Sequence, residues 1–364
     1  MLNNQELYRH LCGIENTTDY RVYFYRAAYE YLHKKDCCTL DKIQKDVSKA
    51  IQLYEDNTGV TEDTKLCYTI LKELLNIDCH TSANYYPMKM YLLSAEILGE
   101  MDRAKDSSGM YRKYYYYCNK VQPAKELRDK DSVIVYSFRR YNEYSLQDII
   151  NGEITCVHPD KMNDPFDSIA NYISKPDRLD KVCHHTQHVK AQSECFKHFT
   201  IRSFVANRET YDNDDRILQG KTMWSHYADN HRGLCLKYKL SKDFFHQFDD
   251  ANNTFTRLIP IEYVDKKISS REALNSDNSF AMKDICWEAE KEVRLLHLSV
   301  EQKDHQSISL DTKSSLEEII FGYCCDENSK KTIEKIAPNG CKLSQMENDD
   351  EDIYTLKKYN YSKE

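Results

Sequence analysis

The first third of the chain carries apolar residues at helical spacing. Tyr20, Tyr23, Phe24 and Ala27 follow the i, i+3, i+4, i+7 pattern of one buried stripe. The pattern recurs over residues 40–54, 66–75, 87–98 and 110–118. Residues 1–125 are therefore predicted to form an all-α helical module, either a bundle or a short solenoid of helical hairpins.

A polar segment over residues 122–131, QPAKELRDKD, contains a proline and marks a boundary. Beyond it the apolar pattern shortens to β-like runs at 132–138, 153–157, 201–206, 233–239, 257–264, 292–299 and 318–321, with a last run at 353–357. Loops of unequal length separate these runs, which argues against alternating βαβ units. Residues 132–364 are therefore expected to form an α+β domain with a curved, largely antiparallel sheet.

The composition excludes several classes of function. The chain has 364 residues, a formal net charge of −8 and nine glycines, so a broad nucleic-acid-binding face is not expected, and no glycine-rich loop of the Rossmann or P-loop kind occurs. No run approaches the ~18 apolar residues of a membrane-spanning helix, and the first residues lack the apolar core of a secretory signal. These features indicate a cytoplasmic protein without membrane association.

Three segments of the second half concentrate side chains that stack, titrate or ligate. They read KMNDPFD over 161–167, KTMWSHYADNHRGLCL over 221–236 and DICWEAEKEVRLL over 284–296. Such a density of functional groups is hard to explain by core packing alone. We expect the three segments to meet in one cleft.

The third segment cannot be one regular strand. Alternation would place Glu288, Glu290, Glu292 and Arg294 on one face, but the residues between them do not all suit a buried face. A bulge or a change from helix to strand is therefore expected near Lys291, and such a break can direct a side chain into a cleft.

The order of these segments resembles a family catalogued as domain of unknown function 2971, found mainly in bacteria and their mobile elements. The matching pieces within residues 132–325 are VYSF, SLQDIINGEITCVHPDKMNDPFD, SFVANRE, TMWSHYADNHRGLCLKY, IEYVD, KDICWEAEKEVRLL and EEIIFG. Family members commonly have a basic residue in the first of these motifs, where this chain has Ser137, with Arg139 and Arg140 displaced outward. The resemblance itself implies no activity.

A fold-level analogy relates the same order of elements to ADP-ribosyltransferases, which consume NAD. That chemistry needs a stacking surface, donors to ribose and phosphate, and a carboxylate that stabilises an oxocarbenium-like state. The catalytic candidates are Glu292, Glu290 and His226, with Glu292 favoured over Glu290 because it adjoins the better strand. The candidates for binding NAD are Tyr227, Trp224, Asn163, Asp164, Asp229, His231, Arg139 and Arg294.

Two other functions stay open. In a nuclease or other hydrolase, His226, Asp229 and His231 would hold a metal ion with Asp164 or Glu290, or His226 would act as a general base without metal. In a non-enzymatic binding or sensor module, Trp224, Tyr227 and Trp287 would pack in the core. Arg294 is expected to pair with Glu290 or Glu292 in every case.

A separate group contains the metal-ligating residue types Cys and His at Cys183, His188, Cys195 and His198. Their spacing fits no standard zinc finger, so no metal is expected. The tyrosine-rich helical module is expected to dock a protein partner or a trigger. With the second domain, it suggests a bacterial defence or toxin-like effector that acts on NAD or a nucleotide.

Overall fold

The computed structural model describes residues 4–14, 17–33, 40–56, 85–121, 130–162, 167, 186–244, 246–265, 280–349, 351–352 and 354–361. The chain forms two compact units. The first comprises Met1–Pro123 with Ile173–Phe196, and the second comprises Ala124–Tyr172 with Lys197–Glu364. The helical unit thus includes residues 173–196, which the sequence pattern had placed in the second domain.

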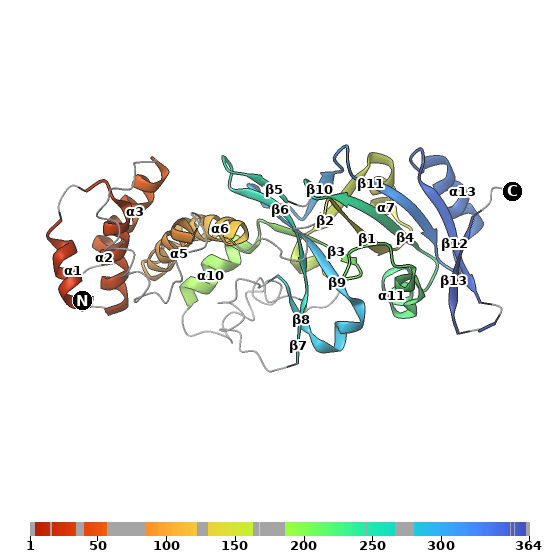
Figure 1. The fold of residues 1–364 in the computed structure, drawn as a ribbon, viewed down its shortest axis with the longest axis horizontal. Helices are drawn as coiled ribbons and strands as arrows, with labels where there is room; N and C mark the ends of the chain where they lie inside the picture. The colour runs from red at the N-terminus through yellow and green to blue at the C-terminus, as the bar shows by residue number, and fades with distance from the viewer. Residues whose placement is uncertain are drawn as a thin grey trace. The chain divides into compact units, whose positions relative to one another are not determined.

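The first unit is helical throughout its described part (Figure 1). Its helices are α1 (Asn4–Cys12), α2 (Tyr20–His33), α3 (Leu40–Glu55), α5 (Tyr85–Glu100), α6 (Ala104–Val121) and α10 (Thr186–Phe196). α2 packs on α3, α3 on α5, α5 on α6, and α6 on α10. The Phe196 ring lies 5.7 Å from that of Tyr115, which explains why α10 joins this unit. The helix expected over residues 66–75 lies outside the described residues.

The second unit is built on a large sheet, for which the described residues supply eleven strands. The strands are β1 (Ser132–Arg139), β2 (Glu153–Val157), β3 (Phe199–Val205), β4 (Leu234–Ser241), β5 (His246–Asp249), β6 (Thr254–Pro260), β9 (Glu292–Leu298), β10 (His305–Ser309), β11 (Ser315–Phe321), β12 (Lys342–Asn348) and β13 (Leu356–Asn360). Their order is β13-β12-β11-β4-β1-β3-β9-β6-β5, with β10 and β2 attached to β3. Apart from the parallel pair β11 and β12, neighbouring strands are antiparallel. The predicted α+β class with a largely antiparallel sheet is confirmed.

The sheet opens between its two central strands. β1 pairs with β4 along its whole length, and β3 pairs with β9 along its whole length. In contrast, β1 and β3 pair at Tyr136↔Val205 alone among the described residues. The sheet therefore consists of two well-paired halves that meet at one position and diverge beyond it.

Helices cover both faces of the sheet (Figure 1). On one face, α7 (Glu143–Asn151) and α13 (Glu327–Ile336) contribute Ile149 and Ile333 to a core with strand residues such as Phe204. On the other face, α11 (Lys221–Tyr227) contributes Trp224, which packs edge-on against Phe138 with ring centroids 5.0 Å apart.

Short elements complete the second unit. They are the 3-10 helices η2 (Pro159–Lys161), η3 (Asp215–Gln219) and η4 (Ile285–Glu290), and the parallel pair β7 (Glu262–Val264) and β8 (Met282–Asp284).

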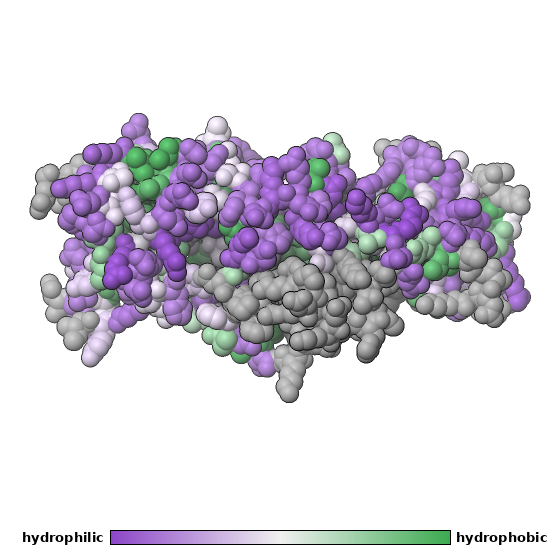
Figure 2. Space-filling model, turned by 180° about the vertical axis from the view of Figure 1, so that it is seen from behind, coloured by the Kyte–Doolittle hydropathy of each residue, from purple (hydrophilic) through white to green (hydrophobic). Residues whose placement is uncertain are grey.

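In the view of Figure 2, hydrophilic residues dominate the described surface and hydrophobic ones form small separate patches. Among the described helices, none combines the length and apolar character needed to cross a membrane.

Candidate active-site cavity

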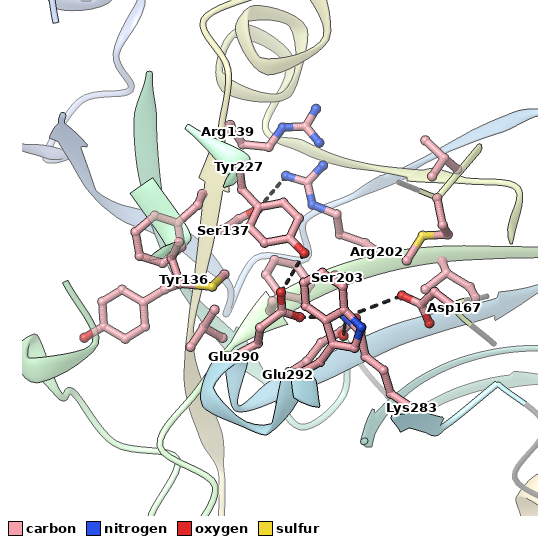
Figure 3. Close-up of a pocket in the computed structure, with 18 of the residues that line it drawn as sticks. Tyr136, Ser137, Arg139, Asp167, Arg202, Ser203, Tyr227, Lys283, Glu290 and Glu292 are labelled. Atoms are coloured by element: carbon pink, nitrogen blue, oxygen red, sulfur yellow. Dashed lines mark hydrogen bonds and ion pairs between the residues drawn. The ribbon is translucent and has the colours of Figure 1, made fainter. Parts of the chain in front are cut away.

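A cavity of about 490 Å³ lies where β1 and β3 diverge (Figure 3). Small-molecule sites in proteins commonly measure about 300–1,000 Å³, so this cavity has the size of a ligand site. Its lining side chains that carry a charge or a hydroxyl are Tyr136, Ser137, Arg139, Thr155, Lys161, Asp167, Arg202, Ser203, Tyr227, Lys283, Glu290 and Glu292. The carboxylates and the arginines gather in different parts of the cavity (Figure 3). We call these parts, with the buried partners behind them, the acidic end (Asp167, Lys283, Glu290 and Glu292, with Arg294 behind) and the basic end (Ser137, Arg139 and Arg202, with Asp148 behind).

The acidic end owes its shape to a break in the backbone. The 3-10 helix η4 ends at Glu290, Lys291 adopts a left-handed conformation with φ 49°, and β9 begins at Glu292. The helix-to-strand change expected near Lys291 is therefore confirmed. Because of this break, Glu290 and Glu292 both line the cavity although they belong to different elements.

Two buried cations hold the carboxylates of the acidic end. Lys283 Nζ lies 2.6 Å from Glu290 Oε2 and 2.9 Å from Glu292 Oε2. Arg294 donates from Nε to Glu292 Oε1 at 2.7 Å and from Nη2 to Asp167 Oδ1 at 2.5 Å. The expected pairing of Arg294 is confirmed with Glu292. Arg294 is fully buried and lies behind the carboxylates instead of lining the cavity.

These contacts set the protonation of the acidic end. Burial alone would raise the pKa of Glu292, but the charges of Arg294 and Lys283 outweigh burial and lower it to about 2. Burial alone would lower the pKa of Lys283, but the charges of Glu292 and Asp167 and the contacts of Glu290 raise it above its usual value. Near neutral pH, Glu292 is therefore a carboxylate and Lys283 an ammonium.

Two aromatic side chains border the acidic end. Tyr227, the last residue of α11, donates its hydroxyl to Glu290 Oε1 at 2.7 Å. Burial and this hydrogen bond raise the pKa of Tyr227, so it stays a donor at physiological pH. Trp287 lies on η4 with Lys283 Nζ 5.0 Å above its ring. Both rings line the cavity and offer apolar surface beside the carboxylates.

The basic end is formed by Arg139 of β1 and Arg202 of β3. Arg202 donates from Nη2 to Ser137 Oγ at 2.8 Å, across the gap between the two strands. The guanidinium group of Arg202 therefore lies beside Ser137 of the first strand. Burial and the charge of Arg202 lower the pKa of Arg139 to about 9.

Two residues of the motif MWSHYADNHRG line the cavity, Met223 and Tyr227. Trp224 is fully buried, and its indole N–H donates to the carbonyl of Leu218 at 2.7 Å. His231 stacks on Trp224 with ring centroids 6.3 Å apart. Most of the aromatic content of this motif therefore anchors α11 to the sheet and so positions Tyr227.

The polar residues of the same motif serve a tight turn. Asp229, Asn230 and His231 follow α11 with φ values of 49°, 51° and 67°, a left-handed conformation that Asn, Asp and His tolerate better than most residues. A side chain at Gly233 would place its Cβ 2.1 Å from the carbonyl oxygen of Arg139, so this position requires glycine. His226 and Asp229 are exposed and do not line the cavity.

Residues 223–295 match the family model described as "Protein of unknown function (DUF2971)". The similarity to this family is therefore shown for that region alone. The matched stretch contains Tyr227, Lys283, Glu290, Glu292 and Arg294, so most of the acidic end lies inside the DUF2971 region. No curated protein and no solved structure matches the chain.

The remaining candidates lie elsewhere. Asn163, Asp164 and Cys183 fall outside the described residues, as does the side chain of His188. Cys195 is buried in α10, and His198 directly precedes β3. Within the described part of the chain, no group of three or more His, Cys, Asp or Glu residues is placed to hold a metal ion.

Sequence patterns did not point to three residues of the cavity, Arg202, Ser203 and Lys283, and they included Asp167 only as the last residue of the KMNDPFD segment. One signal was present for Arg202, because it interrupts the apolar strand FTIRSFV, and a charge in a buried strand requires a partner. Lys283 precedes the DUF2971 motif residue Trp287 by four positions, but nothing local distinguishes it from a surface lysine. Its ion pairs with Glu290 and Glu292 depend on the three-dimensional fold.

Proposed function

We propose that the cavity binds NAD and that Glu290 promotes cleavage of the bond between nicotinamide and ribose, as in an ADP-ribosyltransferase. The observation that carries this proposal is a buried carboxylate, Glu290, positioned by two hydrogen bonds at the opening of a split sheet and flanked by two aromatic rings. Cleavage of a glycosidic bond builds positive charge on the sugar, and a preorganised carboxylate stabilises that charge.

Glu290 suits this role better than Glu292. Each carboxylate oxygen can accept two hydrogen bonds. Glu290 uses one oxygen for Tyr227 and the other for Lys283, so both oxygens retain acceptor capacity for a ribose hydroxyl. Glu292 receives three hydrogen bonds, from Arg294 at both oxygens and from Lys283. We therefore propose that Glu292 holds Lys283 and Arg294 in place and that Glu290 contacts the substrate.

The reaction follows from these assignments. The C–N bond to nicotinamide breaks, and its electron pair leaves with the ring nitrogen, which becomes neutral. The ribose carbon gains oxocarbenium character beside Glu290, and a nucleophile then forms the new bond and loses its proton to solvent water. Water as the nucleophile gives free ADP-ribose, whereas a side chain or nucleic acid gives a modified macromolecule. The aromatic faces of Tyr227 and Trp287 offer a surface on which the nicotinamide ring can stack.

The test uses the full chain with NAD labelled in its adenine part. Nicotinamide release is followed by chromatography, and transfer to macromolecules is followed by the label, with and without bacterial cell extract as a source of acceptor or trigger. Glu290→Gln is expected to reduce release roughly 10²–10³-fold, the effect of removing one group that stabilises transition-state charge. Binding of NAD, measured by calorimetry, should persist in this variant.

Glu288→Gln is the matched control, since Glu288 lies on the same 3-10 helix but is exposed. It should release nicotinamide at the rate of the unaltered protein. Absence of nicotinamide release both with and without cell extract would overturn the proposal. Equal rates for Glu290→Gln and Glu288→Gln would overturn it as well. The expectation that the helical unit receives a partner or trigger remains a prediction, which the comparison with and without extract also addresses.

A further inference from the structure

The two arginines of the basic end share one carboxylate without a close contact to it. Arg202 Nη2 lies 3.6 Å and Arg139 Nη2 lies 3.9 Å from Asp148 Oδ2, both beyond normal hydrogen-bond length. The other oxygen, Asp148 Oδ1, accepts from the backbone N–H of Thr155 at 3.0 Å and from its hydroxyl at 2.5 Å. Two positive charges are thus compensated by one negative charge at a distance.

Arg202 also has unused donor capacity. Its side chain is 5% exposed, yet its Nε has no hydrogen-bond partner among the described residues. The other contacts of the guanidinium are the 2.8 Å bond to Ser137 Oγ and a 3.4 Å bond to the carbonyl of Thr155. An unpaired donor on a buried cation is costly unless another group enters to accept from it.

We infer that Arg139 and Arg202 form a phosphate-binding subsite where β1 and β3 diverge. Both side chains line the cavity, so an anion that enters it can contact the two guanidinium groups at once. A phosphate group presents several oxygens around a tetrahedral centre and carries one or two negative charges, which matches two guanidinium groups better than a planar carboxylate does. Ser137 Oγ accepts from Arg202, which leaves the hydroxyl hydrogen of Ser137 for donation to a phosphate oxygen.

The role of this subsite rests on the proposed function, but its existence does not. For NAD, a phosphate at the basic end would direct the nicotinamide ribose toward Glu290 and so fix the orientation of the substrate in the cavity. The subsite would then discriminate nucleotides from nucleosides. A ligand that lacks phosphate would leave the charge of the two arginines uncompensated.

The test is calorimetric binding to the full chain. ADP-ribose is compared with adenosine, which lacks phosphate, and inorganic pyrophosphate is the third probe. ADP-ribose is expected to bind roughly ten- to a hundredfold more weakly to Arg202→Gln and to Arg139→Gln than to the unaltered protein, the usual effect of losing a charge-assisted hydrogen bond. The weak binding of adenosine should not change. Arg140→Gln is the matched control because Arg140 is the next residue, is exposed and does not line the cavity.

Two further measurements keep the inference falsifiable. Because Arg202 is buried, circular dichroism must show that Arg202→Gln is folded; if it is not, Arg139→Gln decides, since that side chain is 21% exposed. Raising the salt concentration should weaken binding of ADP-ribose to the unaltered protein but affect Arg139→Gln less.

Each outcome has one meaning. Failure of ADP-ribose and pyrophosphate to bind at millimolar concentration, or equal losses in Arg139→Gln and Arg140→Gln, overturns the subsite. Pyrophosphate binding as tight as that of ADP-ribose supports a subsite for free phosphates. Arginine-dependent binding without cleavage of NAD supports the subsite and refutes the proposed function. Cleavage of NAD at an unchanged rate in both Arg139→Gln and Arg202→Gln refutes the subsite and supports the proposed function.

Discussion

The two ends of the cavity differ in how their charges are balanced. The acidic end places three carboxylates, those of Asp167, Glu290 and Glu292, against the two cations of Lys283 and Arg294, and four of the contacts measure 2.5 to 2.9 Å. The basic end places two guanidinium groups against one carboxylate at 3.6 and 3.9 Å. Short contacts between buried charges make the acidic end costly to break, whereas long contacts and an unpaired donor leave the basic end able to accept a ligand.

The comparison also explains why one residue of the acidic end can still meet a substrate. Arg294 and Lys283 neutralise most of the negative charge, so the carboxylate of Glu290 stays in place without a ligand. Since three carboxylates oppose two cations, the acidic end keeps one negative charge, while the basic end keeps one positive charge. The cavity is therefore polarised from end to end and favours a ligand whose own charges are separated.

Arg294→Met is expected to have the largest effect on stability. The change removes a fully buried cation and leaves Asp167 and Glu292 with Lys283 alone. The free energy of unfolding, measured by urea denaturation at pH 7, is expected to fall by about 3–5 kcal/mol. Arg216→Met is the control, because Arg216 pairs with Asp214 at 2.8 Å but is 79% exposed, and it should leave the free energy of unfolding nearly unchanged. Similar losses in the two variants would contradict a supporting role for the acidic end.

The acidic end should also make the stability of the protein sensitive to acid. The pKa of Glu292 is lowered from its ordinary value of 4.5 to about 2 in the folded protein. A carboxyl group with a lowered folded pKa adds stability that is fully present above 4.5 and is lost as the pH falls toward 2. Urea midpoints measured between pH 7 and pH 2 should therefore decline in this window. Glu292→Gln should flatten part of the decline, and an identical slope in the variant would refute the assignment.

Tyr227→Phe is expected to have the smallest effect. It removes the hydroxyl that donates to Glu290 Oε1 but keeps the ring at the cavity. Loss of one hydrogen bond to a charged group should lower kcat/KM for NAD about tenfold, with little change in stability. Tyr323→Phe makes the same chemical change at an exposed position and serves as the control. An unchanged kcat/KM in Tyr227→Phe would mean that the tyrosine does not position Glu290 for catalysis.

Much of the sheet could be predicted because its central strands are apolar. Each apolar run expected between residues 132 and 321 corresponds to an observed strand, among them β1, β3, β4 and β9. β10 and β12 were not expected, since HQSIS and KLSQMEN carry too few apolar residues to show a pattern. Such strands form because a neighbouring strand supplies their hydrogen bonds, which a local pattern does not record.

The sequence indicated the part of the site where strand alternation breaks down. It did not indicate the part where the interacting residues lie far apart in the sequence. The impossible alternation around Lys291 correctly indicated a backbone break beside Glu290 and Glu292. The titratable residues around His226 indicated chemistry, yet Asp229 and His231 lie in a left-handed turn. Arg202 and Ser137 are 65 positions apart, so the contact that defines the basic end depends on the pairing of strands.

Because β1 and β3 pair at Tyr136 and Val205 alone among the described residues, the junction between the two halves of the sheet can change independently of either half. Each half of the sheet keeps its own full ladder of backbone hydrogen bonds, so the distance between the two walls can change at the junction with the loss of very few of them. Substitutions on β1 or β3 can therefore widen or narrow the opening while leaving both halves intact. A fold of this kind can accept ligands of different size through local changes at one seam.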